Sequence, residues 1–311
     1  MTGSDAAGTS VGLALPQFGG TVDRSALRDF CQSAEELGFA SLWVQEHLFY
    51  PHAEGASESD PDYRPGAGTS AYASPRYRSV LSPTETMMAA AAWTERIRIG
   101  SSILVAGYHR PVDLAKRLAT IDVLSDGRLT VGLSVGWSDA EHRQMDVDPT
   151  TRGRRCDEFV PALLACWGPD PVSFDGQFFS IPLADVSPKP LQARIPLLSG
   201  MTSAAGKKRT VQHFDIWEPL GEPHQMRREL EEMNEHRPAG KSPLKFQQRV
   251  FLELPGEDPD PAGVDGALRA VDQARSAGAD GVTIEAGFWR GCASTNDWVA
   301  LPAKLSSAVT G

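Results

Sequence analysis

The stretch RIRIGSSILVAGYHRPVDLAKRLATIDVLSDGRLTVGLSVG, residues 96 to 136, contains a strand, a helix and a second strand in that order. The apolar, β-branched run at residues 97 to 105 is typical of a parallel strand buried on both faces. Pro111 favours the first position of a helix, and Ser125-Asp126-Gly127 ends it. Two buried strands joined by one helix run parallel with a right-handed crossover, and ligands gather at the carboxyl ends of such strands.

The same unit recurs along the whole chain. Eight strands, each followed by a helix, are expected to begin near residues 11, 41, 97, 129, 195, 214, 250 and 281, with the seventh spanning residues 250 to 254. Eight such units favour an α/β fold of the closed (β/α)8 TIM-barrel type over an open doubly wound sheet. No linker divides the chain, so residues 1 to 311 are expected to form a single domain. A hairpin over residues 172 to 181 is expected outside the barrel.

An insertion after the second strand, residues 48 to 80, interrupts this pattern. It is rich in Pro, Gly, Ser, Tyr and acidic residues and has no regular periodicity. A loop of this length inside a compact domain is usually a functional lid or a disordered insert. Tyr50, Tyr63, Tyr72 and Tyr77 favour a lid that packs over a site. A solvated insert is the alternative.

Composition restricts the classes of partner. A net charge of −10 argues against nucleic acid or an anionic membrane surface, so the expected partner is a small-molecule substrate. The start of the chain lacks the features of a signal peptide, and no apolar run is long enough to span a membrane, which favours a cytoplasmic location. The four cysteines form no CxxC pair, so neither a metal site nor a disulfide framework is expected: Cys31, Cys156, Cys166 and Cys292.

Candidate functional residues lie at the predicted carboxyl ends of the strands, where a barrel of this kind builds its chemistry. His47 is the best single candidate, because an imidazole can carry a proton; a structural histidine is the alternative. Residues 199 to 203 place hydroxyls and amides at a helix start, which suits phosphate or simply caps the helix. The remaining candidates on this rim are Gln17, Glu46, Ser101, Ser102, Gly136, Trp137, Gly200, Thr202, Ser203, Glu218 and Glu285.

Other interpretations have less support. Glu46 and Glu285 offer the paired carboxylates of a glycosidase as an alternative, which their spacing does not decide. The basic run of Lys207, Lys208 and Arg209 most often marks a solvated helix face. The sequence contains no HExxH, GxSxG, GxxxxGK[ST] or strand-following GxGxxG, so zinc-protease, hydrolase, P-loop and Rossmann chemistry lack their motifs.

Four segments resemble the bacterial luciferase-like oxidoreductases, in particular the branch that uses coenzyme F420, an 8-hydroxy-5-deazaflavin. They are AEELGFASLWVQEHL at 34 to 48, TERIRIGSSILVAGYHRPVDLAKRLATIDVLSDGRLTVGLSVGWSDAE at 94 to 141, RGRRCDEFVPALLACW at 152 to 167, and VSFDGQFFSIPLADVSPKPLQ at 172 to 192. The resemblance implies a barrel with a flat flavin or deazaflavin ring across the carboxyl ends of its strands. It also implies a cis peptide bond between Ser102 and Ile103, behind that ring.

The resemblance further implies roles for individual residues. His47, with the preceding Glu46, would be catalytic. The cofactor would be bound by Ser101, Ser102, Ile103, Gly136, Trp137, Gly200, Met201, Thr202 and Ser203, with the last four at its phosphate. Two departures stand out: Glu46 replaces the family's usual aspartate, and Trp137 replaces the glutamate of the sugar-phosphate dehydrogenases. The second departure argues against a glucose-6-phosphate dehydrogenase activity.

Three functions follow from these observations. The leading hypothesis is an enzyme that transfers a hydride between coenzyme F420 and a small organic substrate, with His47 as proton donor or acceptor. The second is a monooxygenase that uses reduced FMN. The third is a non-catalytic barrel that binds a flavin or metabolite. Members of the resembling family are often homodimers, and a separate flavin or F420 reductase would supply the reduced cofactor.

Overall fold

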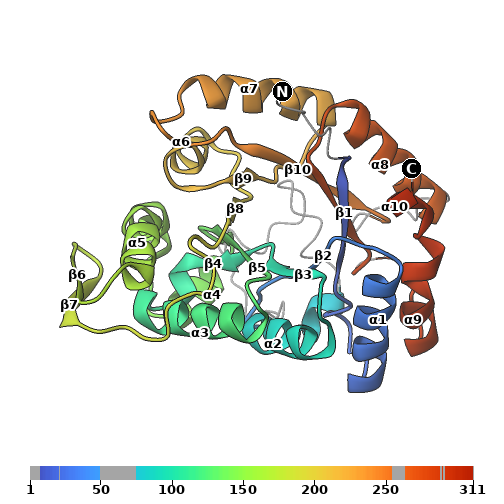
Figure 1. The fold of residues 1–311 in the computed structure, drawn as a ribbon, viewed down its shortest axis with the longest axis horizontal. Helices are drawn as coiled ribbons and strands as arrows, with labels where there is room; N and C mark the ends of the chain where they lie inside the picture. The colour runs from blue at the N-terminus through green and yellow to red at the C-terminus, as the bar shows by residue number, and fades with distance from the viewer. Residues whose placement is uncertain are drawn as a thin grey trace, which may run out of the picture.

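The computed structural model describes residues 8–20, 22–49, 75–253, 263–287, 289 and 291–310. Parallel strands pair edge to edge into a closed ring, and helices surround it (Figure 1), which confirms the predicted (β/α)8 TIM barrel. The strands of the ring are β1 (Ser10–Ala14), β2 (Ser41–Val44), β3 (Arg98–Ser101), β4 (Leu104–Val105), β5 (Leu129–Ser134), β8 (Leu197–Ser199), β9 (Ile216–Trp217), β10 (Lys245–Phe251) and β11 (Gly281–Glu285).

The third predicted strand of the barrel consists of two pieces, β3 and β4. Both pair with β5, and the peptide bond between Ser102 and Ile103, which lies between them, is cis as expected. The surrounding helices are α1 (Arg24–Glu36), α2 (Pro83–Trp93), α3 (Pro111–Leu124), α4 (Asp139–Gln144), α5 (Arg152–Trp167), α6 (Ala204–His213), α7 (Pro223–Glu235), α8 (Gly263–Ser276), α9 (Thr295–Lys304) and α10 (Ser307–Thr310).

The unit that decides the fold forms as predicted. Helix α3 begins at Pro111, and the chain reverses at Asp126 and Gly127, whose φ angles are 54° and 75°, before β5 begins. Glu35, near the end of α1, accepts hydrogen bonds from the amides of Arg96 at 2.6 Å and Ile97 at 2.9 Å. This carboxylate therefore fixes the start of β3 against the first helix.

One large side chain inside the barrel packs against glycines of the two neighbouring strands. The indole of Trp43, on β2, is 4% exposed, and a Cβ atom added to Gly100 would lie 2.4 Å from it. A Cβ on Gly12 would likewise lie 2.8 Å from the indole nitrogen. Glycine is therefore required on the neighbouring strands β1 and β3, because Trp43 occupies the space beside Gly100, and Ser41 together with Trp43 occupies the space beside Gly12.

Strand β10 corrects one prediction. The sequence predicts a strand over residues 250 to 254, whereas β10 begins at Lys245 and ends at Phe251. Its first half contains Gln247, Gln248 and Arg249, which are buried although polar. The predicted start is too late because a buried strand is expected to be apolar. The polar residues at the start of β10 do not fit that pattern, since their partners lie inside the barrel.

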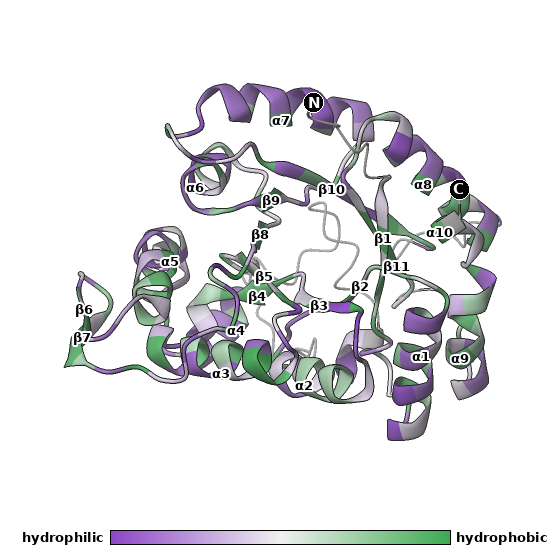
Figure 2. Cartoon of the chain, in the orientation of Figure 1, coloured by the Kyte–Doolittle hydropathy of each residue, from purple (hydrophilic) through white to green (hydrophobic). Residues whose placement is uncertain are grey.

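Segments outside the barrel ring also follow the prediction. The hairpin β6 (Val172–Asp175) and β7 (Ser180–Ala184) projects beside α5 (Figure 1), as expected. Helix α7 on the outer surface is largely hydrophilic (Figure 2). Of the insertion at 48 to 80, the structure describes Leu48, Phe49 and residues 75 to 80; Tyr50, Tyr63 and Tyr72 lie outside the described residues. A 3-10 helix, η4 (Pro75–Arg78), carries the buried Tyr77.

Candidate functional site

A cavity of about 740 Å³ opens at the carboxyl ends of the barrel strands. Residues from the ends of β2, β4, β5, β8, β9 and β10 surround it, so the rim predicted from the strand pattern is the wall of this cavity. Its lining residues are Gln45, Glu46, His47, Tyr77, Ser102, Ile103, Val105, Tyr108, Ser134, Val135, Gly136, Trp137, Glu141, Gly200, Met201, Thr202, Ser203, Arg209, Glu218, Leu220, Gly221, Gln248, Arg249 and Phe251.

The structure brings together the predicted site residues except three, Gln17, Ser101 and Glu285, which do not line the cavity. Glu46 and His47 line the cavity, as do Ser102, Ile103, Gly136, Trp137, Gly200, Met201, Thr202 and Ser203. Ser101 is fully buried in the barrel wall, where its hydroxyl donates to the Gly132 carbonyl at 3.0 Å and accepts from the Gly132 amide at 2.9 Å. Successive side chains of a strand point to opposite faces, so Ser102 faces the cavity and Ser101 does not.

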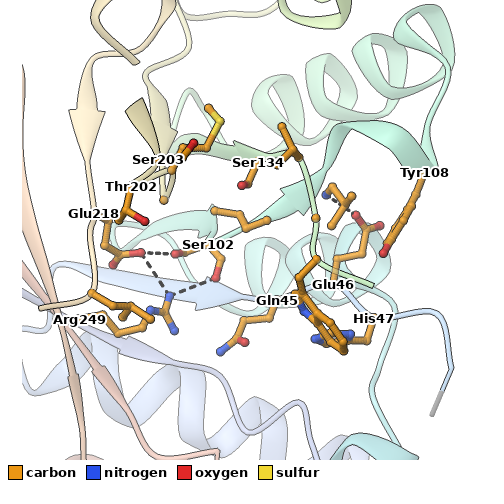
Figure 3. Close-up of a pocket in the computed structure, with 18 of the residues that line it drawn as sticks. Gln45, Glu46, His47, Ser102, Tyr108, Ser134, Thr202, Ser203, Glu218 and Arg249 are labelled. Carbon is orange, nitrogen blue, oxygen red and sulfur yellow. Dashed lines mark hydrogen bonds and ion pairs between the residues drawn. The ribbon is translucent and has the colours of Figure 1, made fainter. Parts of the chain in front are cut away.

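The floor of the cavity is a buried charge network. Arg249 Nη1 lies 2.7 Å from Glu285 Oε2, and its Nη2 lies 3.4 Å from Glu218 Oε2 and 3.1 Å from the Ser102 carbonyl oxygen. The Ser102 hydroxyl donates to Glu218, and Gln45 donates to Glu285. Figure 3 shows Arg249, Glu218 and Ser102 converging beneath the cavity. One guanidinium thus forms ion pairs with two carboxylates.

Electrostatics in this floor follow from burial. Burial raises the pKa of Glu285, and the nearby Arg249 charge only partly offsets that rise. Burial lowers the pKa of Arg249, but the charges of Glu218 and Glu285 raise it by more. The net pKa is raised, so the guanidinium stays charged. Glu285 is fully buried and is not among the lining residues. The paired carboxylates that a glycosidase would need, Glu46 and Glu285, therefore do not flank this cavity.

One wall carries His47 at the end of β2. Its imidazole lies edge-on to Tyr77, with ring centroids 4.5 Å apart, and 5.5 Å from the Trp137 ring. His47 Nδ1 lies 3.4 Å from Glu141 Oε1, on α4. The adjacent Glu46 turns elsewhere: it accepts a hydrogen bond from the Val105 amide at 2.6 Å and contacts His109, as described below. The two predicted catalytic neighbours therefore have different partners.

Opposite surfaces of the cavity are apolar or bare backbone. Ile103, Val105, Val135 and Met201 present apolar surface to it. Gly136 follows β5 with a φ of 74°, and a Cβ there would lie 2.5 Å from Val105 Cγ1 and 2.8 Å from the His142 ring. Only glycine fits, and its bare backbone faces the cavity. Apolar walls with exposed backbone suit a flat ring.

At the far end, the loop after β8 meets the start of α6. Ser203 is the N-cap of α6, and its hydroxyl accepts from the Gly206 amide at 3.1 Å. Arg209, in the second turn of α6, lines the cavity, and its Nε lies 2.5 Å from Asp157 Oδ1. Its neighbour Lys207 pairs with Glu229 at 2.6 Å. The interpretation of this basic run as a solvated helix face is therefore wrong for Arg209. A helix start beside an arginine suits phosphate.

Three functional candidates escaped the sequence interpretation: Glu141, Arg209 and Arg249. Glu141 and Arg249 lie far along the chain from the residues they contact, and nothing in their spacing shows the contact. Arg209 was recognised only as part of a basic run. The sequence signal that points to Glu141 is its position at the end of GWSDAE, within a segment that resembles the family.

Among the residues that the structure describes, no group of three or more His, Cys, Asp and Glu side chains is arranged to hold a metal ion. The four cysteines are buried, as expected. Within the same part of the chain, no helix is both long and apolar enough to cross a bilayer.

Comparison with known proteins places the chain among relatives of two kinds. An uncharacterized protein of Mycobacterium tuberculosis (strain ATCC 25618 / H37Rv) is 33% identical over 60% of this chain and 68% of its own length. An FMNH(2)-dependent dimethylsulfone monooxygenase of Pseudomonas putida is 32% identical over 45% of this chain and 38% of its own. An F420-dependent glucose-6-phosphate dehydrogenase of Kineococcus radiotolerans is 28% identical over 58% of this chain and 49% of its own.

Solved structures agree on the fold. The monooxygenase RslO1 from Streptomyces bottropensis superposes with a TM-score of 0.74 at 19% identity, covering 97% of this chain and 99% of its own. An F420-dependent secondary alcohol dehydrogenase gives 0.69 at 15% identity, with the same coverage. The family model described as luciferase-like monooxygenase matches residues 9–284. The resemblance noted in the sequence is thereby confirmed, and the chain belongs to the luciferase-like monooxygenase family.

Proposed function

We propose that this protein transfers a hydride between coenzyme F420 and a small organic substrate, with His47 carrying the accompanying proton. The observation that carries the proposal is the position of His47: its imidazole lines the cavity beside Trp137, while the Glu141 carboxylate lies 3.4 Å from its Nδ1. The named relatives are oxidoreductases of both cofactor types, which supports oxidoreductase chemistry without choosing the cofactor.

The residues present fit a flat, phosphate-bearing cofactor. Apolar side chains and the backbone of Gly136 would face its ring, with Ser102 and Ile103 behind it. Thr202, Ser203 and Arg209 would bind its phosphate at the start of α6. When bound, the deazaflavin would supply the hydride acceptor or donor. Ser101, which was also expected to bind the cofactor, would act only through the barrel wall.

His47 would balance the hydride with a proton. When a substrate is oxidised at a carbon that bears a hydroxyl, the carbon loses a hydride and the hydroxyl loses a proton. His47, as neutral imidazole, would accept that proton; in the reverse direction, as imidazolium, it would donate one. Glu46 would act indirectly, because its carboxylate is engaged with the Val105 amide and His109.

A specific observation favours a second candidate, a monooxygenase that uses reduced FMN. The Pseudomonas putida protein above is named as FMNH(2)-dependent, and a further relative is the oxygenase component of a flavin-dependent trigonelline monooxygenase from Acinetobacter baylyi. Such an enzyme would need a separate reductase to supply reduced flavin. For either cofactor we propose a homodimer, which light scattering of the purified protein would test.

The deciding experiment is a titration of the apoprotein with F420 and with FMN. Tighter binding of F420, together with turnover that is lost in His47→Asn while binding persists, is the expected result. A clear preference for FMN would replace the first proposal with the second. Binding of either cofactor without turnover across a panel of alcohols and carbonyl compounds would favour the non-catalytic barrel.

A further inference from the structure

Two histidine–carboxylate pairs cross at the end of β2. Glu46 and His47 are neighbours in the chain, yet Glu46 Oε1 lies 2.9 Å from Nε2 of His109, while Nδ1 of His47 lies 3.4 Å from Oε1 of Glu141. The two histidines therefore present different ring nitrogens to their carboxylates. Figure 3 shows Glu46 and His47 diverging from the end of the same strand.

Glu141 is itself fixed by several donors. The Tyr108 hydroxyl lies 2.6 Å from its Oε2, and the amides of Leu48 and Phe49 donate to its Oε1 at 2.7 and 3.3 Å. Its side chain is only 2% exposed. Burial alone would raise the pKa of Glu141, but the hydrogen bond and charge of His47, with Tyr108 and the Leu48 amide, lower it overall. At neutral pH this carboxylate accepts hydrogen bonds and donates none.

We propose that Glu141 is a positioning residue: it holds His47 with the proton on Nδ1 and leaves Nε2 as the nitrogen available to a ligand in the cavity. A neutral imidazole has one donor nitrogen and one acceptor nitrogen, and the neighbour of one decides the state of the other. Because Glu141 only accepts, the nitrogen that faces it must carry hydrogen. Nε2 is then the atom that takes up or returns the proton in the hydride transfer proposed above, on which this role rests.

The same carboxylate also ties His47 to the chain that follows it. Oε1 of Glu141 accepts from the Leu48 and Phe49 amides as well as facing His47, so one oxygen anchors three consecutive residues. The imidazole is further held between Tyr77 and Trp137. Orientation of His47 is therefore set before any ligand enters, which is the pre-organisation that proton transfer requires.

The test is the tautomer of His47, read from imidazole ¹⁵N chemical shifts of the histidine-labelled apoprotein and assigned with His47→Gln and His109→Gln. In the wild type at a pH where both rings are neutral, we expect hydrogen on Nδ1 of His47 and on Nε2 of His109. Glu141→Gln is expected to move the His47 signals toward a mixture of tautomers and leave those of His109 in place. Glu46→Gln, the matched control, is expected to do the reverse.

Three results would overturn the proposal. One is hydrogen on Nε2 of His47 in the wild type, which needs no variant. Another is an unchanged His47 spectrum in Glu141→Gln. The third is an equal response of both histidines to both variants, which would indicate general loosening. Tyr108→Phe, which keeps the carboxylate, should retain hydrogen on Nδ1 of His47. No cofactor is present in these measurements, so their failure is distinguishable from failure to bind or turn over F420.

Discussion

Arg249 reaches across the barrel to Ser102: its Nη2 lies 3.1 Å from the Ser102 carbonyl oxygen, although 147 residues separate the two in the chain. The carbonyl belongs to the peptide that joins β3 to β4, and the hydroxyl of the same serine donates to Glu218. Backbone and side chain of Ser102 are thus both held by one buried network. The floor on which a ligand would rest is therefore fixed by residues from five strands or the positions directly after them: Gln45, Ser102, Glu218, Arg249 and Glu285.

Replacing Arg249 by methionine should destabilise the fold strongly. The side chains of Arg249, Glu218 and Glu285 are 6%, 2% and 0% exposed, so two carboxylates would lose their cation without gaining water. Removing one partner of a buried pair costs about 3–5 kcal/mol of unfolding free energy. Urea denaturation measures this. Adding Glu285→Gln to Arg249→Met should recover part of the loss, and a loss under about 1 kcal/mol in the single variant would show that the network carries no such energy.

The carboxylate of Glu35 should make the stability of the fold depend on pH. Burial raises the pKa of Glu35, but hydrogen bonds from the amides of Ile97, Arg96 and Glu95 lower it by more. The pKa of Glu35 therefore lies below its ordinary value of 4.5. The unfolded chain therefore takes up the proton first as the pH falls, and the stabilisation, full above about 4.5, is lost as the pH drops through the folded-state value.

Comparison of Glu35→Gln with the wild type isolates this effect. At neutral pH the variant should lose about 1.5–3 kcal/mol, the range for hydrogen bonds to a charged group. The difference between the two unfolding free energies should shrink as the pH falls below 4.5. A difference that stays constant down to acid denaturation would contradict the assignment. Glu158→Gln on α5 serves as the control, because it alters another carboxylate that accepts a backbone amide, that of Phe178 in the hairpin.

The order of strands and helices could be predicted because the other buried strands are largely apolar and helices have recognisable ends, as at Pro111 and Asp126-Gly127. The start of β10 could not, since Gln247 and Arg249 are polar residues whose partners come from other strands. The rim residues were found because parallel strands end on one side of a barrel. Their pairing was not, because local sequence places Glu46 beside His47, whereas packing gives each a distant partner.

A close approach inside the barrel predicts the effect of a single added carbon. In Gly100→Ala, the new Cβ would lie 2.4 Å from the Trp43 ring and 3.0 Å from the Thr130 carbonyl oxygen. Neither neighbour can move freely, because the ring is buried and the carbonyl belongs to β5. The expected loss is about 1–3 kcal/mol of unfolding free energy, the usual cost of overpacking a core.

Thermal or urea unfolding of Gly100→Ala beside Gly8→Ala measures this cost. Nothing lies within 4 Å of a Cβ built on Gly8, so that variant should match the wild type. Combining Gly100→Ala with Trp43→Phe should give less than the sum of the two single losses, because the smaller ring makes room for the methyl group. Strict additivity would mean that the methyl group and the indole do not compete for this space.

Arg209 offers a test of where phosphate binds, because it is the cation that lines the cavity next to the N-cap Ser203. Asp157 holds its Nε at 2.5 Å, and the hydrogen bond and charge of that carboxylate raise the pKa of Arg209, so its charge persists at any physiological pH. In Arg209→Met, FMN should bind about tenfold or more weakly, since a charge-assisted hydrogen bond contributes roughly 1.5–3 kcal/mol. Riboflavin, which carries the same ring without phosphate, should bind wild type and variant alike. Equal weakening for both ligands would place the effect of Arg209 on the ring or on the fold. Unchanged FMN binding would indicate that the phosphate does not bind beside Arg209 on α6.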